Sequence, residues 1–187
     1  MCLLDGLTSL VESFGGTSLP STLSPYSDGN CINRVGTGTY QIVHSGTANR
    51  FCGVLSVNDM TPCGMLTIDS AGFVRDPRLV IYFQVADSAY RSVEFQLNDA
   101  MLKLNVNSTT TTELATLTYD PAAHRYWRYR MDTGADVVFE TSPDAIAWTT
   151  RASAAPPFAG NVHLNFGAGF VNTGTATTVS LPGLNAP

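Results

Sequence analysis

The sequence is poor in charged residues, and lysine is nearly absent. Charged residues make up 13% of the 187 residues, the formal net charge is −5, and Lys103 is the only lysine. Proteins that bind nucleic acid through its phosphates carry a basic patch or a run of Lys and Arg. This chain has neither, so the composition argues against nucleic acid as a partner.

Long apolar runs are missing as well. No segment approaches the roughly 20 consecutive apolar residues that a membrane-spanning helix needs. The first ten residues, MCLLDGLTSL, contain no basic residue, and Asp5 and Gly6 interrupt their short apolar run. We therefore expect neither a signal peptide nor contact with a membrane.

The four cysteines form no known motif. Cys2, Cys31, Cys52 and Cys63 contain no CxxC pair and have no neighbouring histidine at zinc-ligand spacing. We expect reduced, buried thiols in a protein made in a cytosol. A disulfide between Cys52 and Cys63, across a hairpin, is the alternative.

Motifs of metal, cofactor and nucleophile sites are also absent from the sequence. It contains no HExxH, GxSxG or phosphate-binding loop, its histidines are scattered, and its turn aspartates lack the DxDxDG frame of a calcium loop. We expect no metal and no cofactor. The residues considered are His44, His124, His163, Asp59, Asp69 and Asp76.

Alternation of apolar and polar residues is what the chain has in abundance. This period-two pattern, interrupted by Asn, Asp, Gly and Pro about every eight to twelve residues, is typical of an antiparallel sandwich. It predicts one all-β domain with far more strand than the roughly 20–25% usual in globular proteins. The clearest segments are residues 31–35, 40–43, 51–57, 65–68, 79–85, 91–97, 102–106 and 162–170.

The beginning of the chain departs from this pattern. Leu3, Leu7, Leu10 and Phe14 recur at helix-like spacing, so we treat residues 1–14 as an N-terminal segment and residues 15–187 as the domain. Residues 15–30 read as a surface loop. Leu3, Leu7 and Leu10 are candidates for an oligomer or attachment contact, and the alternative is that the segment completes the domain's own sheet.

The stretch HRYWRYRMDTGADVVFETSPD predicts a hairpin with its turn at residues 133–135. The register then places Arg128 opposite Glu140 and Tyr129 opposite Phe139. Trp127 shares the face of Tyr129 and Phe139, so these three rings are expected in the core, and the arginines on the outer face.

Trp148 lies beyond this hairpin and two residues after Ile146. If both residues share one face of a strand, Trp148 is a second core aromatic, which is our expectation. The alternative is an exposed ring. In that case Tyr126, Arg128, Arg130 and Trp148 are candidates for contact with a glycan.

The same region carries a resemblance. The His-x-x-Trp-Arg strand, the Gly turn, the FETSPD hairpin, the Trp-Thr strand and the later GAGF resemble a domain common in tail-associated proteins of actinobacterial phages. That domain is similar to the concanavalin A-like lectin/glucanase (LamG-like) group. The resemblance covers about residues 78–170 and implies a jelly-roll β-sandwich of two curved antiparallel sheets.

The fold hosts lectins, hydrolases and inert modules, so the resemblance does not decide the chemistry. A glycosidase needs two carboxylates roughly 5–5.5 Å or 6.5–9.5 Å apart, and hydrolases of this group resemble one another in a Glu-x-Asp-x-x-Glu strand. This sequence has no such run, and its glutamates lie far apart. We therefore expect no enzyme and assign no catalytic residue. The glutamates are Glu12, Glu94, Glu113 and Glu140.

Low charge and the resemblance together predict a structural protein of a tailed-phage virion. A minor tail protein or tail appendage comes first, and a capsid decoration protein second. The chain would assemble with itself and other virion proteins in the host cytoplasm, with host-surface carbohydrate as a further partner. The alternative is a free, lectin-like carbohydrate-binding module.

Overall fold

The structure is a computed structural model that describes residues 6–29, 31–36, 38–131 and 135–185. About half of the chain lies in strands, and the only helix among the described residues is one 3₁₀ turn, η1 (Leu7–Ser9), which is far too short to cross a membrane. The strands are β1 (Leu23–Ser27), β2 (Cys31–Gly36), β3 (Thr39–His44), β4 (Arg50–Ser56), β5 (Gly64–Asp69), β6 (Leu79–Ala86), β7 (Ser92–Asn98), β8 (Met101–Asn107), β9 (Thr111–Thr118), β10 (Tyr126–Met131), β11 (Val137–Ser142), β12 (Thr149–Ala154), β13 (His163–Phe170) and β14 (Thr177–Leu181).

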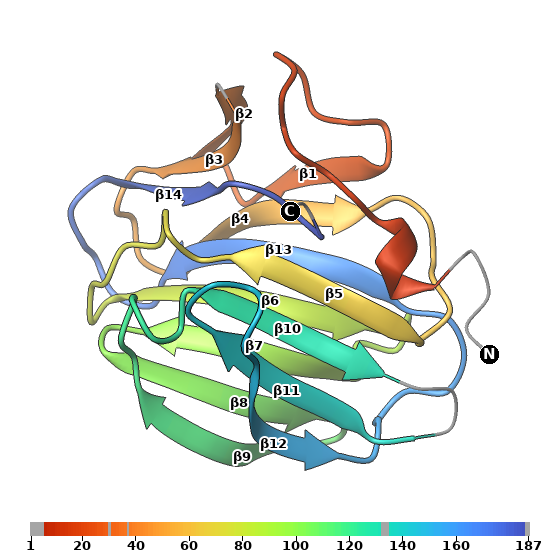
Figure 1. Cartoon of the computed structure of the whole chain (residues 1–187). Helices are drawn as coiled ribbons and strands as arrows, with labels where there is room; N and C mark the ends of the chain where they lie inside the picture. The colour runs from red at the N-terminus through yellow and green to blue at the C-terminus, as the bar shows by residue number, and fades with distance from the viewer. Residues whose placement is uncertain (1–5, 30, 37, 132–134, 186–187) are drawn as a thin grey trace.

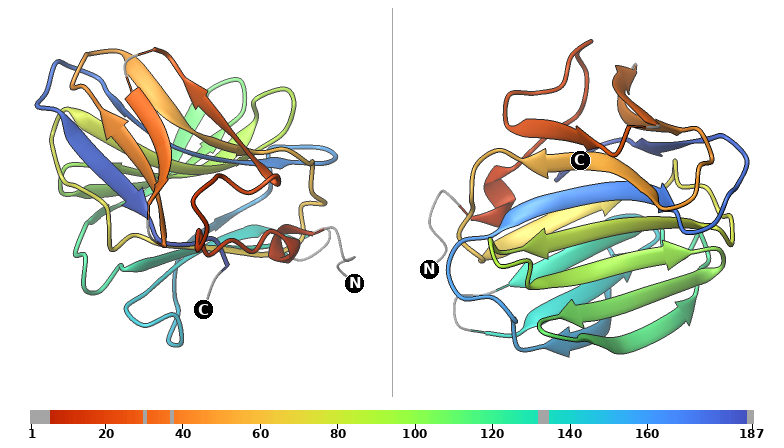
Figure 2. Two further views of the ribbon diagram at one scale, coloured as in Figure 1. Left: turned by 90° about the horizontal axis from the view of Figure 1, so that it is seen from above. Right: turned by 180° about the vertical axis from the view of Figure 1, so that it is seen from behind.

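Two antiparallel sheets face each other and enclose the core (Figure 1). The front sheet has the order β12-β11-β10-β5, and the back sheet has the order β13-β6-β7-β8-β9. The pair β1-β4 and the sheet β14-β3-β2 extend the sandwich beyond β13, as both views in Figure 2 show. The predicted all-β, antiparallel jelly roll is confirmed.

Alternation along the strands separates a core face from an outer face. In β7, the apolar side chains of Val93, Phe95 and Leu97 are buried in the core. Glu94 and Gln96 lie between them in sequence and therefore point to the outer face of the back sheet. Burial of each large apolar side chain contributes roughly 1.5–3 kcal/mol, which holds this register in place.

The hairpin of β10 and β11 has the register that the sequence predicts. Arg128 pairs with Glu140 and Tyr129 pairs with Phe139. Trp127, Tyr129 and Phe139 are all fully buried. The predicted core placement of these three rings is confirmed, whereas residues 132–134, which include most of the predicted turn, lie outside the described residues.

The described part of the N-terminal segment, residues 6–14, contributes its large apolar side chains to the core. Leu7, Leu10 and Phe14 are 0%, 6% and 2% exposed, and Leu3 lies outside the described residues. Glu12 exchanges two backbone hydrogen bonds with Leu184 near the other end of the chain. Leu7 and Leu10 are therefore unavailable as an attachment contact, because the apolar surface they would offer is already buried within the chain.

The prediction of a loop over residues 15–30 is wrong for β1. Residues 23–27 form an edge strand that pairs with β4, with Leu23 buried and Tyr26 half-buried. Pro25 is tolerated because an edge strand leaves one row of backbone groups unpaired. The proline-rich composition concealed the strand.

Both expectations for the cysteines are wrong. Cys31 on β2 and Cys52 on β4 form a disulfide, with their Cα atoms 6.4 Å apart. Cys63 is also disulfide-bonded, and Cys2 lies outside the described residues. No sequence pattern indicates this pairing, because it depends on the packing of β2 against β4.

Candidate functional site

A groove of about 420 Å³ lies on the outer face of the back sheet, the side seen in the right panel of Figure 2. Side chains from seven strands and one hairpin line it, and most of them are polar or aromatic. They are Tyr26, Leu55, Tyr82, Gln84, Ala86, Tyr90, Ser92, Asn107, Thr111, His163 and Asn165.

A row of polar side chains begins in this groove with Asn165 and Gln84 and continues along the same face of the back sheet. Asn165, Gln84, Glu94 and Asn105 are direct cross-strand partners on β13, β6, β7 and β8. Neighbouring strands lie about 4.8 Å apart, so each side chain reaches the next. Asn165 donates to Gln84 and Asn105 donates to Glu94, both at 3.0 Å, and Gln84 donates to the other oxygen of Glu94. We call these four residues the polar row.

Glu94 is the only carboxylate in the polar row. It is 8% exposed, and burial raises the pKa of its carboxyl above the ordinary value, although hydrogen bonds from Asn105 and Gln84 oppose the shift. Lys103, further along this face, is paired with Glu113 at 2.8 Å. No described residue that lines the groove is Lys or Arg.

Two tyrosines close one end of the row. Tyr26 donates to the side-chain oxygen of Asn165 at 3.0 Å, and its hydroxyl contacts that of Tyr82. Burial raises the pKa of both phenols, that of Tyr82 to about 12, so both remain neutral. Gly53 and Gly167 leave the room these rings occupy, since a Cβ at either position would overlap the Tyr26 hydroxyl. We call Tyr26 and Tyr82 the tyrosine pair.

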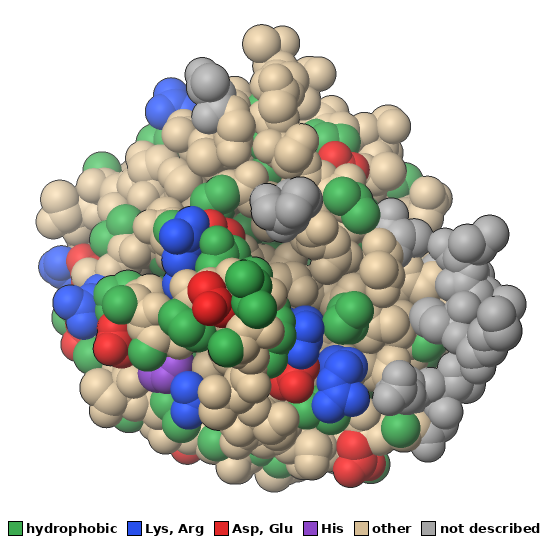
Figure 3. Space-filling model, in the orientation of Figure 1, with side chains coloured by type: hydrophobic (Ala, Val, Ile, Leu, Met, Phe, Trp, Pro, Cys, Tyr) green, Lys and Arg blue, Asp and Glu red, His purple; other side chains and the backbone are tan. Residues whose placement is uncertain are grey.

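The four residues that the sequence suggested as glycan contacts lie on the opposite side of the molecule. Figure 3 views this outer face of the front sheet, where basic and acidic side chains lie in mixed groups. Arg128 forms an ion pair with Glu140 at 2.7 Å and lies 3.8 Å from the centre of the Trp148 ring. Arg130 also lies near Glu140, at 3.5 Å, and the half-buried Tyr126 packs against Arg125.

Trp148 is half-buried, so its predicted place in the core is wrong, but the ring is not fully exposed either. The carboxylate of Asp144 accepts hydrogen bonds from the backbone of Ile146 and Ala147. The chain therefore turns here, and Ile146 is 84% exposed. Trp148 and Arg128 line a shallow hollow of about 280 Å³, and its role in binding stays a prediction.

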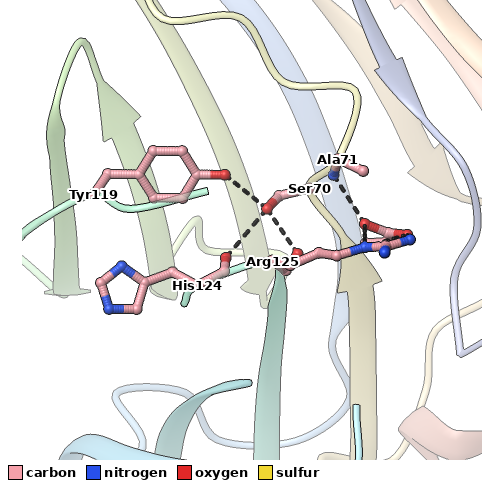
Figure 4. Close-up of polar contacts among 6 residues, drawn as sticks. Ser70, Ala71, Tyr119, His124 and Arg125 are labelled. Carbon is pink, nitrogen blue, oxygen red and sulfur yellow. Dashed lines mark hydrogen bonds and ion pairs between the residues drawn. The ribbon is translucent and has the colours of Figure 1, made fainter. Parts of the chain in front are cut away.

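A buried cluster near the end of β5 holds a serine beside a histidine, but it is not a catalytic pair. The Ser70 hydroxyl contacts the Tyr119 hydroxyl at 2.8 Å and the backbone oxygens of His124 and Arg125 at 3.2 and 2.7 Å. Figure 4 shows the His124 ring pointing away from Ser70. This cluster fixes the segment that enters β10.

The aspartates considered for calcium lie apart in the fold. Asp69 is paired with Arg125, and Asp76 is paired with Arg78, both at 2.8 Å. Among the described residues, no group of three His, Cys, Asp or Glu side chains could hold a metal ion.

The groove residues were visible in the sequence only as the polar members of alternating strands. Gln84, Glu94, Asn105 and Asn165 carry amides or a carboxylate at outward positions where Thr or Lys would serve solubility equally well. These residue types single out individual positions but do not show which positions lie side by side. Their assembly into one row depends on the order β13-β6-β7-β8.

The comparisons with known proteins concern the fold. No family model and no curated protein matches the sequence. Among solved structures, the carbohydrate recognition domain of Emp47p has a TM-score of 0.60 at 11% identity, with 94% of this chain and 92% of that chain covered. Porphyranase B from Zobellia galactanivorans has a TM-score of 0.64 at 11% identity, with coverage of 96% and 91%. The exoplasmic/lumenal domain of VIP36, in its Ca²⁺/Man2-bound form, has a TM-score of 0.60 at 8% identity, with coverage of 94% and 85%.

At such low identities these likenesses show the fold alone. The chain has the concanavalin A-like lectin/glucanase fold, as the resemblance implied. That fold is shared by carbohydrate-recognition domains and by carbohydrate-cleaving enzymes. The residues of the groove, and not the fold, must therefore indicate which of the two roles this chain has.

Proposed function

We propose that the protein is a lectin-like module that binds an uncharged oligosaccharide in the groove without cleaving it. The observation that carries this proposal is the polar row beside the tyrosine pair. Amides and phenols both donate and accept hydrogen bonds, which suits a ligand rich in hydroxyl groups. The carbohydrate recognition domain of Emp47p and the Man2-bound domain of VIP36 have the same fold, which supports a sugar as the ligand.

The charges around the groove favour a neutral ligand. A sulfated or uronic-acid glycan would need basic side chains, because a buried anion without a partner is costly. The described lining contains neither Lys nor Arg. Glu94, next to Gln84 of the lining, would repel an anion whenever it is ionised.

The neighbours of Glu94 argue against cleavage. Both retaining and inverting glycosidases use two carboxyl groups flanking the scissile bond. The cross-strand partners of Glu94 are Gln84 and Asn105, and its neighbours on the same face of β7 are Ser92 and Gln96. None of these four residues has a carboxyl group, so Glu94 has no partner for acid–base catalysis beside it.

The disulfides are consistent with a protein that works outside a reducing cytosol. A place in a phage virion, as a tail or capsid protein and as an oligomer, rests on the sequence resemblance and stays a prediction. A sugar-binding module displayed on a particle satisfies both proposals.

An array of neutral, uronic-acid and sulfated oligosaccharides tests the proposed function. We expect binding to neutral glycans, weakened by Gln84→Ala in the groove and unchanged by Trp148→Ala on the front sheet. The reverse pattern would place the site on the face that the sequence suggested. Release of reducing ends from β-glucan, agarose or arabinogalactan that is lost in Glu94→Gln would show an enzyme instead.

A further inference from the structure

Tyr90 lies in the hairpin between β6 and β7, at the end of the groove opposite the tyrosine pair. Its side chain lines the groove and is 84% exposed. Its backbone has φ = 61°, in the left-handed region that a bulky residue rarely adopts. Strained backbone of this kind persists only where neighbouring contacts impose it, and it is frequent at binding sites.

Asp87 supplies those contacts. Its carboxylate is nearly buried and accepts hydrogen bonds from the backbone N–H groups of Ala89 and Arg91 and from the Arg91 side chain, at 2.7–3.0 Å. The backbone N–H of Tyr90 donates to the Asp87 carbonyl at 3.0 Å. The hairpin is therefore held rigid while the ring it presents remains free of protein contacts over most of its surface.

Polar side chains line the groove together with the Tyr90 ring. Asn107 donates to the Ser92 hydroxyl at 3.0 Å and accepts from the Thr111 hydroxyl at 2.8 Å. His163 completes this end of the groove. A flat apolar ring next to hydroxyl and amide groups offers one surface for the face of a sugar ring and another for its hydroxyl edge.

We propose that Tyr90 forms a preorganised stacking subsite for an uncharged pyranose ring at the β6–β7 end of the groove. Asp87 and Arg91 act as positioning residues that hold the aromatic ring in its binding orientation. Because the hairpin is already ordered, little conformational entropy is lost when the ligand binds.

This inference rests on the proposed function and extends it from one site to two ends of a groove. The tyrosine pair includes Tyr82 in the middle of β6, whereas Tyr90 lies in the hairpin that follows Ala86 at the end of β6. Tyr82 and Ala86 are four residues apart, or about 13 Å along the strand. The ligand is therefore a chain of several sugar units and not a monosaccharide.

The test measures affinity by calorimetry with hexasaccharides from β-glucan, mannan and agarose. With the hexasaccharide that the wild-type protein binds, Tyr90→Ala should weaken binding by about tenfold. Tyr90→Phe should bind nearly as well, because stacking does not need the hydroxyl. Ile146→Ala is the matched control, since Ile146 is also 84% exposed but lies on the other face.

Stability provides a second readout. Glycine adopts a left-handed backbone without strain, so Tyr90→Gly should melt at a higher temperature than Tyr90→Ala while binding just as poorly. If the wild-type protein binds a hexasaccharide and Tyr90→Ala binds it equally well, the subsite is overturned and the proposed function stands. If the wild-type protein binds none of the three and no neutral glycan on the array, the proposed function fails and the subsite fails with it.

Discussion

Trp127 lies among aromatic rings at the centre of the sandwich. Its ring is 5.1 Å from that of Phe73 and 5.4 Å from that of Phe95, measured between centroids. Its indole nitrogen donates to the backbone oxygen of His124 at 2.8 Å. Full burial and a satisfied polar atom identify this side chain as a structural one.

Replacement of Trp127 by alanine should therefore lower the free energy of unfolding by roughly 3–5 kcal/mol, because it removes buried contacts and leaves a cavity. Trp148→Ala is the control and should cost less than about 1 kcal/mol, since that ring is half-exposed. Denaturant unfolding of both variants measures the difference. Equal losses would contradict the assignment of the two rings.

The contribution of Glu94 to folding stability depends on pH, because its carboxyl group is buried. Its folded pKa lies above that of the unfolded chain, so the folded protein binds this proton more tightly. Stability from this group is complete in acid and is lost as pH rises through the raised pKa. Glu94→Gln should melt close to the wild-type temperature at about pH 4 and above it at about pH 8.

Glu113→Gln is the control for this pH dependence, with the opposite sign. A hydrogen bond from Lys103 lowers the pKa of Glu113, so its contribution to stability is present at neutral pH and lost in acid. That variant should therefore melt below the wild type at neutral pH, and the gap should close in acid. Thermal melts across pH compare the two, and a gap for Glu94→Gln that does not change with pH would refute the role of its charge.

At the scale of elements, glycines determine how closely β13 and β4 approach. A Cβ on Gly53 would overlap the backbone oxygen of Phe166, and one on Gly167 would overlap the tyrosine pair. The absence of both side chains lets the two strands lie side by side and seats the phenols over the backbone. The packing of these two strands thus shapes one end of the groove.

Gly167→Ala should displace the tyrosine pair, so we expect weaker glycan binding together with a lower melting temperature. Gly15→Ala is the control, because a Cβ there would meet its nearest atom at an ordinary 3.8 Å. Calorimetry and thermal melts of both variants provide the comparison. Unchanged binding in Gly167→Ala would show that the ligand does not use this end of the groove.

At the scale of the whole molecule, the first and the last described segments of the chain bind each other and close the sandwich. The backbone N–H of Leu7 donates a hydrogen bond to the backbone oxygen of Cys63 at 2.8 Å. The side chain of Asn185 donates to the backbone oxygens of Leu7 and Leu10, both at 3.0 Å. The first described residues are therefore joined to the last ones and to β5.

Leu7→Ala distinguishes this arrangement from an oligomer contact. A buried leucine truncated to alanine costs roughly 2–5 kcal/mol, and here the loss should be independent of protein concentration because the contacts lie within one chain. Unfolding at two concentrations measures it. A loss that appears only at high concentration would restore the attachment role that the sequence suggested for Leu7.

The sequence by itself determined most of the strands, the core aromatic residues and the register of β10 with β11. Alternation and a short turn are local signals, and the energy of burying Trp127 or Tyr129 is much the same whatever lies further along the chain. The tertiary structure alone decided the Cys31–Cys52 bond, the exposure of Trp148 and the polar row. Asn165 reaches Gln84 across 81 residues, and that meeting depends on sheet order, which the packing of distant segments selects.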